Sequence, residues 1–281
     1  MPLWIAVLLL GVIEGITEFL PVSSTGHLLI AENLLLKIHA LSPADWLIKA
    51  SPAKDLFNVV IQCGAVLAVL PLFPERLKQF FFRWREPATR DYLLKIVVAC
   101  AITGGPGYLL EKKQFKLPDK LFPIAVALFI GGICFIVVER WLRGRPSKND
   151  VTWPIVVAVG VGQLLAAVFP GTSRSGATIL LALVLGLNRF AATEFAFLVG
   201  IPTMLAAGGL KILKALRHAD GAPAEDWSMV LLGFLVAAIV SFFAVKWLLR
   251  YVQTHTFTAF GWYRVALAAF LALLLFIGGS N

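Results

Sequence analysis

Residues 14–27 read Glu14-Gly-Ile-Thr-Glu18-Phe-Leu-Pro-Val-Ser-Ser-Thr-Gly-His27 and separate two apolar stretches, Met1 to Ile13 and Leu28 to Leu36. Proline followed by small polar residues ends a helix, and the apolar stretch after the cluster begins another helix. The pattern therefore predicts a broken helix or a re-entrant helical hairpin.

The composition of the whole chain indicates that this hairpin lies in a membrane. Of the 281 residues, 59% are hydrophobic and 15% are charged, and the mean hydropathy is +0.85. These values exclude an ordinary soluble globule. Several stretches without Asp, Glu, Lys or Arg approach the roughly 20 residues that a spanning helix needs. Crossings are predicted near residues 56–73, 92–110, 121–141, 191–214, 228–250 and 259–279.

The interrupted segment has a second copy about 149 residues later. Pro21 aligns with Pro170, and Ser24 aligns with Ser173 within the cluster Pro170-Gly-Thr-Ser-Arg-Ser-Gly176. Each copy has an apolar helix, a proline, a Ser/Thr/Gly cluster and another apolar helix, which is typical of inverted-repeat membrane proteins.

The predicted fold is an all-α polytopic membrane protein with two inverted repeats, six transmembrane helices and two re-entrant helical hairpins. We expect a single integral membrane domain over residues 1–281, with repeat one at about 1–110, repeat two at about 150–250 and a final helix at about 259–279. Three crossings separate the hairpins, so we expect the hairpins to enter from opposite faces and to meet near the midplane.

Basic residues in the loops predict the orientation. The loops 75–91 and 140–150 are the richest in arginine and are expected to be cytoplasmic, which places both termini outside. The formal net charge of +9 is scattered over such short loops. Topology and anionic lipid explain that charge, so no nucleic-acid partner is expected.

Glu14 and Glu18 lie four residues apart, so a helix places both carboxylates on one face. An ionised group at bilayer depth costs ~2.5 kcal/mol or more, and a like charge beside it raises that cost. We expect a divalent metal, Arg174 or both to offset the pair. The alternative is a solvated pair at the membrane interface.

Both polar clusters are candidate phosphate sites because each stands at the start of a helix, where free N–H groups and the helix dipole favour anions. Simple helix capping is the alternative for the serines.

His27 follows the first cluster as a candidate base or nucleophile. Arg174 offers a planar fork that matches phosphate oxygens, and its alternative role is a salt bridge to Glu14 or Glu18. Glu194 is predicted to be a helix N-terminal carboxylate rather than a catalyst.

These two segments closely resemble the signature segments of the bacterial undecaprenyl-diphosphate phosphatase family, also called the bacitracin resistance protein. The resemblance extends to Val60-Ile-Gln62-Cys-Gly-Ala65 and Thr193-Glu-Phe-Ala-Phe-Leu198. It implies hydrolysis of a C55 isoprenoid diphosphate to its monophosphate in the bacterial inner membrane. That reaction recycles the lipid carrier for peptidoglycan synthesis and gives bacitracin resistance.

The resemblance also implies residue roles. Glu14 and Glu18 would be the acidic pair that binds a divalent cation, Mg²⁺ or Ca²⁺, and Arg174 would clamp phosphate. Ser24 and His27 would be the candidate nucleophile or base, and a metal-bound water is an open alternative as nucleophile. The expected phosphate-binding residues are Ser23, Thr25, Gly26, Thr172, Ser173, Ser175, Gly176 and Thr178.

The expected partners are a polyprenyl diphosphate substrate and membrane lipid, and a homodimer is left open. A polyprenyl-phosphate flippase is the rival function, because broken helices in inverted repeats also occur in transporters. The serines and His27 beside paired glutamates exceed what binding needs, which favours the enzyme.

Overall fold

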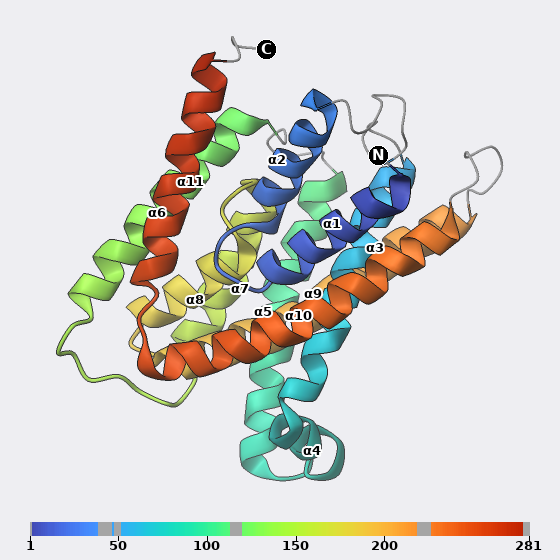
Figure 1. Ribbon diagram of the computed structural model, residues 1–281. Helices are drawn as coiled ribbons and strands as arrows, with labels where there is room; N and C mark the ends of the chain where they lie inside the picture. The colour runs from blue at the N-terminus through green and yellow to red at the C-terminus, as the bar shows by residue number, and fades with distance from the viewer. Residues whose placement is uncertain (1, 39–46, 48–51, 113–119, 218–225, 278–281) are drawn as a thin grey trace. The chain divides into compact units, whose positions relative to one another are not determined.

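The structure is a computed structural model that describes residues 2–38, 47, 52–112, 120–217 and 226–277 (Figure 1). Within these ranges the regular elements are helices, and one isolated bridge joins Lys148 to Leu187. The predicted all-α class is therefore confirmed. The elements are α1 (Leu3–Thr17), α2 (Ser24–Lys37), α3 (Pro52–Val69), the 3₁₀ turn η1 (Leu70–Leu72), α4 (Pro74–Phe82), α5 (Pro87–Lys112), α6 (Leu121–Trp141), α7 (Trp153–Val168), α8 (Arg174–Val184), α9 (Arg189–Arg217), α10 (Trp227–Thr254) and α11 (Thr258–Ile277).

Six helical stretches are long and apolar enough to cross a membrane. Each overlaps one predicted crossing, so the prediction of six helices of spanning length and composition is confirmed. They span Ala53–Leu72, Pro87–Leu109, Leu121–Trp141, Arg189–Leu213, Trp227–Thr254 and Thr258–Phe276. The inverted relation of the repeats and the re-entry of the hairpins stay predictions. Met1 and residues 278–281, where the prediction about the termini falls, lie outside the described residues.

Four shorter helices lie where the two hairpins are predicted. α1 is followed by α2 after a turn at residues 18–23, and α7 is followed by α8 after a turn at residues 169–173. α7 and α8 pack against each other. A break in an apolar segment therefore occurs at both positions that the sequence indicated.

Residues 75–91 differ from the simple loop that the sequence predicted. Most of this stretch is helical, because α4 covers Pro74–Phe82 and α5 begins at Pro87 (Figure 1). Proline suits the first position of a helix, where its missing N–H is not needed. Glu75 follows in the first turn of α4, where a carboxylate stabilises the positive end of the helix dipole.

The chain divides into two compact units. The first unit comprises Met1–Phe19, His27–Pro74 and Ile201–Lys246, and the second comprises Leu20–Gly26, Glu75–Gly200 and Trp247–Asn281. We describe each unit by itself.

In the first unit, α1 packs closely on α10. A Cβ atom on Gly15 would lie 2.7 Å from the carbonyl oxygen of Ala237, and one on Gly11 would lie 3.1 Å from that of Gly233. Small residues at these positions let the two backbones approach, as in many membrane helix pairs. Phe57 and Ile61 of α3 belong to the same buried core.

In the second unit, α6 and α11 lie side by side (Figure 1). Their approach is as close as that of α1 and α10, because a Cβ atom on Gly132 would lie 2.7 Å from the carbonyl oxygen of Gly261. α7 packs on both α5 and α8, and α8 also contacts α6. One of the two polar clusters lies at the beginning of α8.

Candidate functional site

The first polar cluster forms a turn that caps α2. Ser23 is 3% exposed and has a φ of 74°, a left-handed conformation that non-glycine residues seldom adopt. Its Oγ accepts a hydrogen bond from the backbone N–H of Gly26, at 3.4 Å. α2 begins at the next residue, Ser24.

The second polar cluster repeats this construction at α8. Ser173 has a φ of 68°, and its Oγ accepts a hydrogen bond from the backbone N–H of Gly176, at 3.1 Å. Ser173 thus matches Ser23 in conformation and in capping. The alignment of Ser173 with Ser24 was wrong by one residue, because Gly171, with a φ of 90°, adds a position after the proline in the second copy.

Direct contacts bring the two turns together within the second unit. The Ser175 hydroxyl donates to the carbonyl oxygen of Leu20, at 3.1 Å. The Arg264 guanidinium donates to the carbonyl oxygen of Pro21 at 3.2 Å and to that of Thr172 at 3.0 Å. The beginnings of α2 and α8, which are about 150 residues apart in sequence, are therefore neighbours.

Arg264 was missed by the sequence reasoning. It lies in α11 and is fully buried, with 0% of its surface exposed. The signal for it was present, because residue 264 falls inside the crossing predicted at 259–279. An ionisable side chain at such a position is a functional candidate by default.

Arg174 is the first residue of α8. One of its terminal nitrogens, Nη1, donates to the carbonyl oxygen of Gly200, at 3.1 Å. A Cβ atom on Gly200 would lie 3.0 Å from that nitrogen, so glycine leaves room for the guanidinium. Thr178 donates from its hydroxyl to the carbonyl oxygen of Arg174 one turn back, at 2.8 Å.

The acidic pair lies on α1 and the residue that follows it. Glu14 is 0% exposed and Glu18 is 7% exposed. The backbone N–H of Glu18 donates to the carbonyl oxygen of Glu14 at 2.9 Å, so helical spacing continues through Glu18. Burial of both carboxylates argues against the alternative of a solvated interfacial pair.

The predicted site residues divide between the two units. Glu14, Glu18 and His27 belong to the first unit, whereas the residues of the two turns and of the start of α8 belong to the second. The latter are Ser23, Ser24, Thr25, Gly26, Thr172, Ser173, Arg174, Ser175, Gly176 and Thr178. Assembly of all of them into one site stays a prediction.

A fully protein-bound metal centre is not found among the described residues. No group of three or more His, Cys, Asp or Glu side chains lies close enough together there to hold an ion. Glu14 and Glu18 would supply two carboxylate ligands. That number fits Mg²⁺, which typically binds one or two carboxylates together with substrate phosphates and water.

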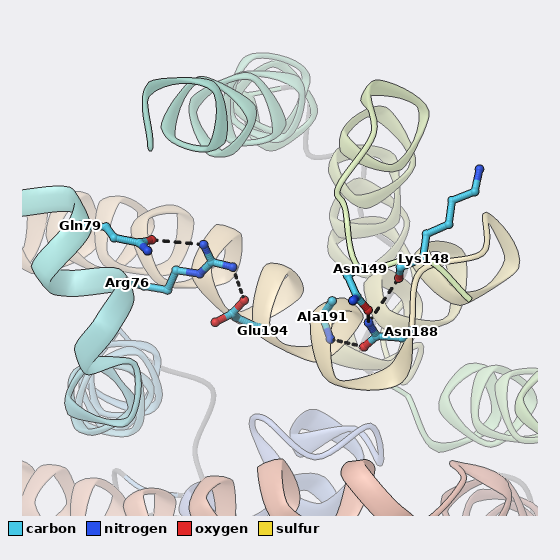
Figure 2. Close-up of polar contacts among 7 residues, drawn as sticks. All are labelled: Arg76, Gln79, Lys148, Asn149, Asn188, Ala191 and Glu194. Carbon is cyan, nitrogen blue, oxygen red and sulfur yellow. Dashed lines mark hydrogen bonds and ion pairs between the residues drawn. The ribbon is translucent and has the colours of Figure 1, made fainter. Parts of the chain in front are cut away.

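Glu194 serves a structural contact. Its carboxylate forms an ion pair with Arg76 of α4, at 2.9 Å, and Arg76 also donates to Gln79, at 3.2 Å (Figure 2). At the start of the same helix, α9, the Asn188 side chain accepts a hydrogen bond from the N–H of Ala191, at 2.8 Å (Figure 2). These contacts fix the beginning of α9. Glu194 is the sixth residue of that helix, beyond its first turn, so its predicted place at the helix N-terminus is wrong, and its non-catalytic role stays a prediction.

Comparison with known proteins matches nearly the whole chain. The family described as "Bacitracin resistance protein BacA" matches residues 7–270. A protein of Rhizobium etli named "Undecaprenyl-diphosphatase" is 50% identical over 264 residues, which are 94% of each chain. A protein of the same name from Xanthomonas euvesicatoria pv. vesicatoria is 46% identical over 272 residues, 96% of this chain and 97% of that protein.

Proposed function

The chain belongs to the bacitracin resistance protein family, and from this membership we propose that it is an undecaprenyl-diphosphatase. It hydrolyses undecaprenyl diphosphate to undecaprenyl phosphate and inorganic phosphate. This reaction recycles the lipid carrier for peptidoglycan synthesis and gives resistance to bacitracin. The observation that carries the proposal is the identity of 50% over 94% of the chain to a relative of that name.

The two turns supply groups that suit a diphosphate. Each turn begins a helix whose first N–H groups have no partner within the helix, and such groups bind phosphate. The contact between Ser175 and Leu20 places two helix starts beside each other. We infer that the phosphates bind there, with Arg174 stabilising the charge that spreads over the transferred phosphoryl group.

The chemical step breaks the phosphoanhydride bond between the two phosphorus atoms. Either the Ser24 hydroxyl attacks the terminal phosphorus and passes its proton to His27 or Glu18, or a water molecule attacks it directly. In both routes the P–O bond of the phosphoanhydride breaks and the lipid monophosphate leaves. In the serine route, water then hydrolyses the phosphoserine, which releases inorganic phosphate and restores the Ser24 hydroxyl. A divalent cation, Mg²⁺ or Ca²⁺, held by Glu14 and Glu18 would neutralise phosphate charge when bound.

Purified protein in lipid nanodiscs should release one phosphate from each C55 diphosphate, and a chelator should abolish the release. The variant Arg174→Ala, prepared in parallel, controls for contaminating phosphatases. A protein that binds the lipid diphosphate and moves it between leaflets without releasing phosphate would contradict the proposal and favour the flippase.

A further inference from the structure

The Arg264 guanidinium connects backbone carbonyls from three parts of the second unit. Nη1 donates to Pro21 at 3.2 Å in the first turn, and Nη2 donates to Gly171 at 3.3 Å and to Thr172 at 3.0 Å in the second. Nη2 also donates to Ala127 at 3.2 Å and Nε to Leu128 at 3.4 Å, both in α6. The Ser175 hydroxyl also contacts both turns, at the Leu20 carbonyl oxygen and the Ser173 hydroxyl, whereas Arg264 donates to backbone carbonyls of both.

We propose that Arg264 is a positioning residue that locks both polar turns into one anion-binding arrangement and supplies an uncompensated positive charge behind them. The inference rests on the proposed function, because the anion would be the diphosphate of the substrate. Arg264 acts through the backbone of the turns and touches no reacting atom.

The surroundings of Arg264 fit a guanidinium closely. A Cβ atom on Gly131 would lie 2.2 Å from Nη2, and one on Gly176 would lie 3.0 Å from Nη1. A Cβ atom on Gly132 would lie 3.1 Å from the Cβ of Arg264. Glycines of α6 and α8 therefore leave the space that the planar group fills, so its position is defined by packing as well as by hydrogen bonds.

The contacts of Arg264 lie next to the two strained serines. Thr172 directly precedes Ser173, and Pro21 stands two residues before Ser23. A non-glycine residue with positive φ persists only where the surrounding structure holds it. Arg264 provides such a hold on both turns at once.

The same hydrogen bonds fix the direction in which a backbone N–H of the second turn points. The carbonyl of Thr172 points toward Arg264, and no cis peptide occurs among the described residues, so the N–H of Ser173 points away from the guanidinium. No described residue accepts a hydrogen bond from this N–H. It is a donor at the start of α8, where an anion is expected to bind.

The charge of Arg264 is not neutralised within the described part of the chain. All of its hydrogen bonds there go to carbonyl oxygens, and no described carboxylate forms an ion pair with it. Carbonyl dipoles offset only part of the cost of burying a cation. A bound diphosphate would offset more, so the buried charge favours the anionic ligand.

The variants Arg264→Lys and Arg264→Gln distinguish the contribution of the planar guanidinium from that of its positive charge. Lysine keeps the charge but not the planar fork, so we expect kcat to fall at least 10-fold while KM changes less than about 3-fold. Glutamine removes the charge as well, so KM should also rise. The matched control is Arg189→Lys, at an arginine paired with Glu139 in the same unit, and it should keep kcat and KM.

Hydrogen exchange without substrate tests the positioning role independently of catalysis. In Arg264→Lys, amides of residues 20–27 and 171–177 should exchange at least 10-fold faster, whereas Arg189→Lys should leave them unchanged. Wild-type exchange and turnover in Arg264→Lys would overturn the proposal, as would a lower melting temperature with unchanged kcat and KM. If the wild-type protein hydrolyses no diphosphate, the proposed function fails, and the exchange result still decides the role of Arg264.

A second variant keeps the test decisive if substitutions at Arg264 do not fold. Gly131→Ala leaves the arginine in place but crowds Nη2, so it should accelerate exchange in both turns and lower kcat. Its control is Gly104→Ala, because no atom lies within 4 Å of a Cβ atom there. Equal behaviour of these two alanine variants would also overturn the proposal.

Discussion

Glu18 carries one of the two buried carboxylates on which the proposed chemistry depends. Its replacement by glutamine keeps the size of the side chain and removes the charge. We expect turnover in Glu18→Gln to fall by about 100-fold or more, the effect of losing an acid–base group or a metal ligand. Phosphate release by the purified variant measures this.

The control for that variant is Glu194→Gln, which breaks the ion pair with Arg76. It should lower the melting temperature and leave turnover within a few-fold of wild type. Near-normal turnover in Glu18→Gln would remove the acidic pair from the mechanism.

Arg174 is expected to act through its fork as well as its charge. Arg174→Ala should abolish phosphate release, because the developing charge on the phosphoryl group loses its donor. Arg174→Lys should lose most activity and keep most of its stability. Paired measurements of phosphate release and melting temperature check both variants, and full activity in either would contradict the predicted clamp.

At the scale of single residues, the sequence predicted helix starts where a motif concentrates polar groups in a short segment. Ser23, Ser173 and Arg174 lie in such segments, and the structure places them at helix starts. Arg264 stands alone between apolar residues, and its partners are backbone carbonyls up to 243 positions away. Carbonyls carry no sequence signal, so this contact was not predictable beyond the rule that a buried arginine needs partners.

The packing of α1 on α10 depends on the absence of a side chain at Gly15. In Gly15→Ala, the new methyl group would meet the Ala237 carbonyl oxygen at 2.7 Å and the Val240 Cβ at 2.8 Å, so the helices must separate. We expect a destabilisation of roughly 1 to 3 kcal/mol, typical of overpacking, and lower turnover because Glu14 and Glu18 flank this contact. Thermal unfolding in detergent measures the first effect.

Gly104→Ala is the matched control, since open space surrounds that position in α5. Alanine is the better helix former, so this variant should be more stable by roughly 0.5 to 1 kcal/mol. A loss of stability there equal to that of Gly15→Ala would contradict the packing explanation.

Glu139 of α6 contacts both α9 and the residue just before α11 in the second unit. Its Oε1 accepts from the Arg189 side chain at 2.9 Å and from the backbone N–H of Phe257 at 2.8 Å. Glu139→Gln should destabilise the protein by about 2 kcal/mol, less than for a fully buried pair because the Arg189 side chain is 32% exposed. A double-mutant cycle with Arg189→Gln, read by melting temperature, should show coupling between the two sites.

At the scale of the whole molecule, the predicted orientation is testable by cysteine labelling. Arg145 is exposed in an arginine-rich loop that should be cytoplasmic. Ser228 is exposed at the start of the crossing Trp227–Thr254, an end that the predicted orientation places outside. In a variant without native cysteines, Arg145→Cys should resist a membrane-impermeant maleimide in intact cells, and Ser228→Cys should react. The reverse pattern would invert the orientation.

Hydropathy predicted the six helices of spanning length well, because a spanning helix must be apolar over its whole length. The helix α4 was missed, since nine residues that include three Phe and three charged side chains give no sustained apolar signal. The register of the two turns was also missed by one residue. An alignment anchored on prolines has no means to detect the extra left-handed position at Gly171.

The bonds of Arg264 also set an order of events during synthesis. The carbonyl of Pro21 leaves the ribosome 243 residues before its donor does. At about 5 to 20 residues per second, that interval is roughly 12 to 50 s. During this time the Pro21 carbonyl has no Arg264 donor, and the membrane interior offers few other hydrogen bonds. The nascent hairpin therefore depends on transient partners such as water, lipid headgroups or the insertion machinery. A stop codon shortly before position 264 would therefore leave the first turn without its Arg264 donor, although that turn is synthesised long before.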